Sequence, residues 1–213
     1  MKNFIIFEGP DFSGKTTIMN KLMEEHLSNP IGINTREPGS YLVPSSFKCE
    51  SYRQQLLSDN NTAMQEAKIF AESRLYHTRD IIKYLEFHNI FCDRYIVSSL
   101  AYQGYAQDLG KEEIYRLNEE SLNLLKDNGI KMHIIKFNIS EEEWIKRRNK
   151  RLKVSNLDTI ESKNIDYKVL NFYSDNEIYK DYTDKLNAIH YDIDANLSVD
   201  DIYKNVMKII KNI

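Results

Sequence analysis

Short apolar runs alternate along the chain with longer stretches in which apolar residues recur every three or four positions. The runs have the length of buried strands and cover residues 4–7, 32–35, 90–92, 133–137 and 190–193. The longer stretches have helical spacing and cover residues 16–26, 62–87, 111–126, 141–152 and 199–210. This alternation predicts a three-layer α/β/α fold, in which a five-stranded parallel sheet has helices on both faces.

A glycine-containing loop follows the first apolar run directly. Its residues are Gly9, Pro10, Asp11, Phe12, Ser13, Gly14, Lys15, Thr16 and Thr17. They fit the pattern G-x-x-x-x-G-K-[ST], in which backbone N–H groups and the start of a helix face a polyphosphate. Lys15 adds a charge for the β- and γ-phosphates, and the Thr16 hydroxyl can hold Mg²⁺. The loop therefore predicts that the protein binds a nucleoside triphosphate with Mg²⁺.

Length and composition limit the remaining possibilities. A chain of 213 residues with 41% hydrophobic and 29% charged residues is typical of one globular domain, 1–213. The net charge of −3 gives no support for binding to nucleic acid. No apolar segment is long enough for a membrane span, and Cys49 and Cys92 lack metal-ligand spacing. We therefore expect a cytoplasmic protein that binds neither membranes nor nucleic acid.

Charged residues follow two of the predicted strands, at the edge where parallel sheets bind ligands. Arg36 and Glu37 come after the second strand, and Asp93 and Arg94 come after the third. A carboxylate in the position of Asp93 is typical of a Mg²⁺ site in enzymes with a phosphate loop. The planar guanidinium of Arg94 suits a phosphate. The alternative for an isolated Asp-Arg pair is a surface salt bridge.

Three further segments carry candidate binding groups. Residues 98–104 contain hydroxyls, a phenol and an amide that could bind a sugar and a base. Phe70 and Arg74 share one helix face and could stack on a base and donate to its carbonyl, although a core Phe beside a solvated Arg fits equally well. Residues 146–153 include six basic residues. They could form a solvated helix face or a cationic lid that closes on phosphates. The polar residues 153–166 predict a mobile loop.

Four of these segments together resemble the thymidylate kinase family. They are the first strand with its phosphate loop, the run Thr35-Arg36-Glu37-Pro38-Gly39, the helix segment 70–77 with Phe70 and Arg74, and the stretch from Cys92 to Gly104. The resemblance extends over most of the chain. It implies a homodimeric kinase that transfers the γ-phosphoryl group of MgATP to dTMP, giving dTDP and ADP.

The resemblance also implies roles for individual residues. The loop residues 9–17 would bind ATP, and Thr16 and Asp93 would serve Mg²⁺. Arg94 would bind the acceptor phosphate with help from Arg36 or Arg53, and Asp11 would contact the sugar 3′-hydroxyl or the metal site. Glu37 would face the acceptor or its metal-bound water. Phe70 would stack on thymine, Arg74 would bond its carbonyl, and Ser99, Tyr102 and Gln103 would line the rest of the pocket. The expected catalytic residues are Asp11, Lys15, Arg94, Arg148 and Arg151.

Some positions depart from the family pattern. Phe12 stands where the family has Gly or a basic residue, so the phosphate loop supplies no catalytic arginine. The lid, about 146–164, has Thr159 where the family has an arginine. We therefore expect that Arg147, Arg148 or Arg151 substitutes for it. Val97 replaces an Asp, and residues 40–48 do not match.

Three alternatives to a dTMP kinase remain at this stage, and the third of them is a catalytically weakened relative, which Thr159 and Val97 suggest. The first is a kinase for another deoxynucleoside monophosphate or for a deoxynucleoside, which would need a carboxylate base such as Glu37 or Asp93. The second is a GTPase-type switch, which predicts an Asn-Lys-x-Asp motif that the sequence lacks.

Overall fold

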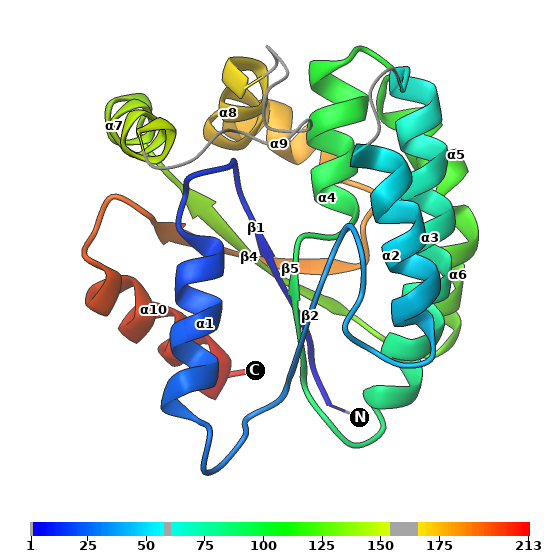
Figure 1. Ribbon diagram of the computed structural model, residues 1–213, viewed down its shortest axis with the longest axis horizontal. Coiled ribbons are helices and arrows are strands. Elements are labelled where there is room, and N and C mark those ends of the chain that lie inside the picture. The colour runs from blue at the N-terminus through cyan, green and yellow to red at the C-terminus, as the bar shows by residue number, and fades with distance from the viewer. Residues whose placement is uncertain (1, 58–60, 154–165) are drawn as a thin grey trace.

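A five-stranded sheet forms the centre of the protein (Figure 1). In the computed structural model, which describes residues 2–57, 61–153 and 166–213, all five strands are parallel, in the order β2-β3-β1-β4-β5. The strands are β1 (Phe4–Glu8), β2 (Ile33–Arg36), β3 (Ile90–Asp93), β4 (Met132–Asn138) and β5 (Ala188–Asp194). All five predicted strands are confirmed, with small shifts at their ends.

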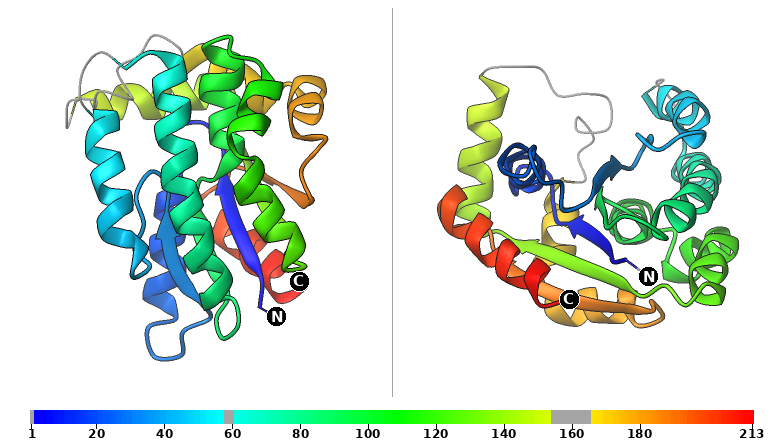
Figure 2. Two further views of the ribbon diagram at one scale, coloured as in Figure 1. Left: turned by 90° about the vertical axis from the view of Figure 1, so that its right-hand side faces the viewer. Right: turned by 90° about the horizontal axis from the view of Figure 1, so that it is seen from below.

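The two faces of the sheet pack into two separate cores. Successive side chains of a strand point to opposite faces, so Phe4 and Ile6 lie in one core while Ile5 and Phe7 lie in the other. The first core includes residues of α3 (Ala63–Tyr84), and the second includes residues of α1 (Lys15–Glu25) and α10 (Val199–Lys211). Figure 2 shows the helices on both sides of the sheet. The predicted three-layer α/β/α fold is confirmed.

The sequence pattern predicts some helices correctly and one wrongly. α1, α3, α7 (Glu141–Leu152) and α10 are close to the predicted ranges. The single helix expected over 111–126 is instead two helices, α5 (Lys111–Leu117) and α6 (Glu119–Asp127). Asn118 separates them, and its Nδ2 donates to the carbonyl oxygen of Ile114 at 2.8 Å. An Asn side chain that bonds to the backbone in this way competes with helix continuation.

Five helical segments have no counterpart in the predicted ranges. They are α2 (Ser45–Leu57), α4 (Ile96–Ser99), the π-helical segment η1 (Leu100–Ala106), α8 (Asp166–Ser174) and α9 (Asn176–Thr183). α2 escapes prediction because its buried residues, Ser45, Cys49 and Leu56, give almost no apolar periodicity. No helix in the described ranges has the length and apolarity needed to cross a bilayer. The predicted lid begins within α7, and its residues 154–164, Thr159 included, lie outside the described residues.

The Glu8 carboxylate at the end of β1 fixes the turn that follows β3. The chain turns at Arg94, whose φ of 67° is unusual for a residue with a side chain. Glu8 is fully buried, and its Oε1 accepts from the backbone N–H groups of Tyr95 at 2.7 Å and Ser98 at 3.3 Å. Its Oε2 accepts from Ser98 Oγ at 2.8 Å and Tyr173 Oη at 2.9 Å. One carboxylate thus joins β1, α4 and α8 beneath the phosphate loop.

We expect Glu8→Gln to destabilise the protein by about 1–3 kcal/mol, because an amide nitrogen in place of Oε2 cannot accept from the two hydroxyls. Urea unfolding measures this loss. Tyr173→Phe is the matched control, because it removes one hydroxyl and leaves the carboxylate, and its cost should be about 1 kcal/mol. A Glu8→Gln protein as stable as the wild type would contradict this account.

Candidate active site

Two cavities meet at the carboxyl ends of β1 and β3. The first, which we call the aromatic cavity, has a volume of about 270 Å³, and the second, the phosphate-loop cavity, has a volume of about 740 Å³. Asp11, Asp93 and Arg94 line both cavities. A molecule in one cavity can therefore reach a molecule in the other beside these three side chains.

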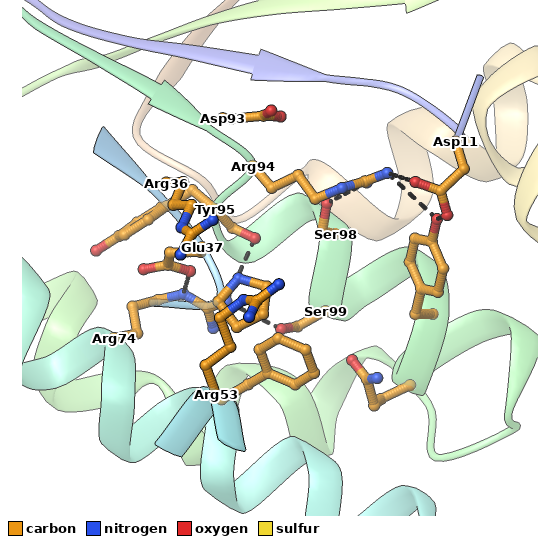
Figure 3. Close-up of a pocket in the computed structure, with 14 residues that line it drawn as sticks. Asp11, Arg36, Glu37, Arg53, Arg74, Asp93, Arg94, Tyr95, Ser98 and Ser99 are labelled. Atoms are coloured by element: carbon orange, nitrogen blue, oxygen red, sulfur yellow. Dashed lines mark hydrogen bonds and ion pairs between the residues drawn. The ribbon is translucent and has the colours of Figure 1, made fainter. Parts of the chain in front are cut away.

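The aromatic cavity brings together all ten residues that the sequence predicts around an acceptor. These are Asp11, Arg36, Glu37, Arg53, Phe70, Arg74, Arg94, Ser99, Tyr102 and Gln103. They come from the phosphate loop, the end of β2, α2, α3, the end of β3, α4 and η1. Figure 3 shows several of these side chains around the cavity. These residues are far apart in the sequence, and the parallel sheet and α3 bring them together.

Lys15 and the phosphate loop form the floor of the second cavity. Lys15 Nζ donates to the carbonyl oxygens of Gly9 at 2.9 Å and Pro10 at 2.8 Å. A side chain on Gly9 would not fit, because its Cβ would lie 2.9 Å from the carbonyl oxygen of Phe137. Burial and the neighbouring charge of Arg94 lower the pKa of Lys15 to about 8, against the opposing effect of nearby carboxylates.

The predicted metal residues Thr16 and Asp93 lie side by side. Thr16 Oγ1 donates to Asp93 Oδ2 at 2.8 Å. The other carboxylate oxygen, Asp93 Oδ1, is buried and has no hydrogen-bond partner in the described parts of the chain. A hydroxyl beside an unsatisfied carboxylate oxygen is a set of hard oxygen donors that fits Mg²⁺ or a water molecule bound to it.

Asp11 and Arg94 form an ion pair at the junction of the two cavities (Figure 3). Arg94 Nη2 contacts Asp11 Oδ1, and Tyr102 Oη donates to Asp11 Oδ2 at 2.5 Å. Arg94 Nη1 donates to Ser98 Oγ at 2.9 Å. Burial raises the pKa of Asp11, but the charges of Arg94 and Lys15 and the hydrogen bonds outweigh this effect and lower it overall. Asp11 is therefore an ionised partner of Arg94 and a poor proton acceptor.

Arg74 is held in the aromatic cavity by four hydrogen bonds. It is 1% exposed, and its Nε donates to Glu37 Oε2 at 2.7 Å. Its Nη1 donates to Asn118 Oδ1 at 2.6 Å, and its Nη2 donates to Ser99 Oγ at 3.0 Å and to the carbonyl oxygen of Tyr95 at 3.3 Å. Within the described residues these bonds use four of its five N–H groups. One Nη1 hydrogen is left for a ligand.

Glu37 lines the aromatic cavity, and its carboxylate also holds two neighbouring side chains. Its Oε2 accepts from Arg74, and its Oε1 contacts His77 Nδ1 at 3.2 Å. His77 Nε2 in turn contacts Thr35 Oγ1 at 2.7 Å. All four side chains are buried. Glu37 therefore orients Arg74, and both of its oxygens are engaged by protein groups.

Two further arginines lie at the rim of the aromatic cavity. Arg36 pairs with Glu50 at 2.9 Å and lies 4.7 Å from the ring centre of Tyr41. Arg53 comes from α2, and Figure 3 shows it on the opposite side of the cavity from Arg94. Glu50, Tyr41 and Arg53 lie in or next to the helix that the apolar pattern does not predict.

The basic helix α7 borders the phosphate-loop cavity. Arg147 and Arg151 line it, and Arg147 also donates to the carbonyl oxygens of Ser13 at 3.2 Å and Ala195 at 2.7 Å. Arg148 points elsewhere, because its Nε donates to Asp166 Oδ2 at 3.2 Å and its guanidinium stacks 5.7 Å from the ring of Trp144. The structure therefore separates the three arginines that the sequence offers as equivalent.

Phe12, which departs from the family pattern, is accommodated by α7. Its φ of 65° lies in the left-handed region that favours glycine, and its ring packs 6.1 Å from that of Trp144. Trp144 Nε1 donates to the carbonyl oxygen of Asp11 at 2.9 Å. The other notable departure, Val97, is buried in the first core. Sequence reasoning misses Trp144 because it lies on the apolar stripe of a helix, where a core role is the default interpretation.

Comparisons with known proteins identify the family of the chain. Residues 7–204 match the family model described as Thymidylate kinase. A thymidylate kinase of Bacillus licheniformis is 34% identical over 98% of this chain and 94% of its own length. One of Bacillus pumilus is 30% identical over 98% of this chain and 95% of its own length. The crystal structure of a thymidylate kinase from Ehrlichia chaffeensis superposes with a TM-score of 0.65 over 99% of this chain and 98% of its own chain. The two sequences are 24% identical. The chain belongs to the thymidylate kinase family.

Proposed function

We propose that the protein transfers the γ-phosphoryl group of MgATP to dTMP, giving dTDP and ADP. The observation that carries this proposal is the shared border of the two cavities at Asp11, Asp93 and Arg94. A triphosphate on the loop and a monophosphate in the aromatic cavity would place donor and acceptor phosphates together there. Family membership over almost the whole chain supports the same reaction.

The acceptor base is assigned from the shape and donors of the aromatic cavity. Phe70 offers a face for a planar base, and the N–H of Arg74 that bonds to none of the described residues offers a donor for a base carbonyl. The buried network around Arg74 fixes the direction of that donor. This supports a base with a carbonyl at this edge, which thymine has and cytosine lacks.

The residues of the junction act by positioning and by stabilising charge. Lys15 and the loop N–H groups would hold the donor phosphates, and Arg94 would hold the acceptor phosphate. The acceptor needs no general base, because a phosphate monoester carries about 1.5 to 2 negative charges at neutral pH. The lowered pKa of Asp11 and the paired oxygens of Glu37 agree with a reaction without a carboxylate base.

Thr16 and Asp93 would hold Mg²⁺, since the buried, unpartnered Asp93 Oδ1 fits an ion or its water. When bound, the ion supplies neutralisation of charge on the transferring phosphoryl group.

The testing experiment is ADP release from MgATP with dTMP, dUMP, dCMP, dGMP, dAMP and thymidine as acceptors. We expect strong turnover with dTMP, weaker turnover with dUMP and very little with the others. Turnover with thymidine but not dTMP would identify a deoxynucleoside kinase instead. GTP hydrolysis that is independent of every acceptor would identify a GTPase-type switch.

The lowered pKa of Lys15 predicts a pH dependence for ATP. Lys15 carries its charge below a pKa of about 8 and loses it as the pH rises, so kcat/KM for ATP should fall above pH 8. The measurement is kcat/KM at low ATP and saturating dTMP from pH 6.5 to 9.5. Lys15→Arg is the control, since a guanidinium stays charged over this range and should give a flat profile. A flat wild-type profile would contradict the assignment.

We also propose that an α7 arginine supplies the transition-state charge that the lid lacks. Alanine at Arg151, which lines the phosphate-loop cavity, should lower kcat on the order of 10³-fold, as loss of a cationic clamp does in related phosphoryl transfers. Alanine at Arg148, which pairs with Asp166, should lower kcat less. Arg147→Ala should mainly weaken ATP binding, because Arg147 holds the loop carbonyl of Ser13. Lys153→Ala is the control, because it removes an exposed charge next to the end of the same helix. Unchanged kcat in all three arginine variants would refute the proposal.

Family membership also leads us to propose a cytoplasmic homodimer. Val43 and Phe47, in and next to the start of α2, are strongly exposed apolar side chains that a second copy could cover. Sedimentation analysis should give a mass of two chains, and Phe47→Asp should lower it to one. A wild-type monomer at micromolar concentration would contradict the dimer.

A further inference from the structure

Glu66 is a buried carboxylate that has no part in the reaction described so far. It lies on α3, one turn before Phe70 and two turns before Arg74, so the three side chains share one face of the helix. Glu66 is 4% exposed, and its Oε2 accepts from Gln103 Nε2 at 3.3 Å and from Gln107 Nε2 at 3.0 Å. A buried acid beside the base-binding residues needs a physical reason.

The contact with Glu66 fixes which end of the Gln103 amide faces the acceptor. A side-chain amide can present either an oxygen or an NH₂ group, and the two orientations occupy nearly the same space. A carboxylate has no hydrogen to donate, so it selects the orientation with Nε2 toward Glu66. The carbonyl oxygen of Gln103 accepts no hydrogen bond from the described residues and is the end left for a ligand in the aromatic cavity.

We propose that Glu66 is a positioning residue for base selection: it holds Gln103 as a hydrogen-bond acceptor, so that the cavity reads a base with an N–H beside a carbonyl. This rests on the proposed function. Thymine and uracil present N3–H next to O4, which match the Gln103 oxygen and the remaining N–H of Arg74. Cytosine presents an unprotonated N3 next to an amino group. The cytosine N3 would then face the Gln103 oxygen, which is also an acceptor. The cytosine amino group would face the Arg74 N–H, which is also a donor.

The proposal predicts a change in selectivity when the carboxylate becomes an amide. In Glu66→Gln the new side chain can accept from Gln103 or donate to it, so both orientations of Gln103 become available. We expect the ratio of kcat/KM for dTMP to that for dCMP to fall on the order of tenfold. The reason is that Gln103 can then turn its NH₂ group toward cytosine N3, which removes part of the cost of a mismatched buried polar pair. The same ratio of binding constants, measured by calorimetry without ATP, should fall in parallel.

Two further variants separate positioning from a general structural role. Gln107→Met removes a second donor to Glu66 and leaves Gln103 in place, so the dTMP to dCMP ratio should stay within about twofold of the wild type. Gln103→Met removes the amide that Glu66 is proposed to orient. Adding Glu66→Gln to Gln103→Met should therefore cause no further loss of selectivity. Thermal unfolding of all variants reports any loss of folding separately.

The outcomes distinguish this proposal from the proposed function. A lower selectivity in Glu66→Gln, absent in Gln107→Met, supports it. An unchanged dTMP to dCMP ratio in Glu66→Gln would overturn it. The proposal would also be overturned if the double variant changed the ratio by the product of the two single effects. A wild-type protein that binds dCMP as tightly as dTMP would overturn it as well. A wild type that binds dTMP selectively but does not phosphorylate it would overturn the proposed function, and the binding ratios would still test Glu66.

Discussion

The ion pair between Asp11 and Arg94 is the contact on which the site depends. Asp11 belongs to the phosphate loop and Arg94 to the turn after β3, so the pair ties the donor side to the acceptor side. Charge and hydrogen bonds keep Asp11 ionised despite its burial, and Glu8 holds the turn that carries Arg94. In the proposed function, the groups that would bind the phosphates are therefore fixed before either substrate binds, which is the condition for catalysis by electrostatic preorganisation.

In the proposed function, a second network sets the identity of the acceptor. Arg74 crosses the space between α3, β2 and α4, and buried partners fix four of its N–H groups. Glu37 and Asn118 serve this arginine and are distant in sequence from it. The junction of the two cavities thus contains the carboxylate of Asp11, with Glu8 holding the turn of Arg94, and the separate buried carboxylates of Glu37 and Glu66 bond to side chains of the aromatic cavity.

Much of the fold could be predicted from sequence because its signals are local. Five apolar runs predicted the strands, and the motif at 9–17 predicted the loop between β1 and α1 that borders the phosphate-loop cavity. α2 could not be predicted, since its buried side is formed by Ser45, Cys49 and Leu56 and depends on packing against α3. The break at Asn118 also depends on a tertiary contact, because Arg74 bonds the oxygen of the same amide whose nitrogen caps α5.

The candidate site could be predicted residue by residue but not contact by contact. All ten residues expected around the acceptor line one cavity, yet the sequence did not reveal that Glu37 faces Arg74 or that Arg148 pairs with Asp166. The most direct test of the account is a crystal structure with adenosine and thymidine joined through five phosphates. The phosphates should pass between Lys15 and Arg94, with thymine between Phe70 and Gln103. Thymidine bound outside the aromatic cavity would contradict it.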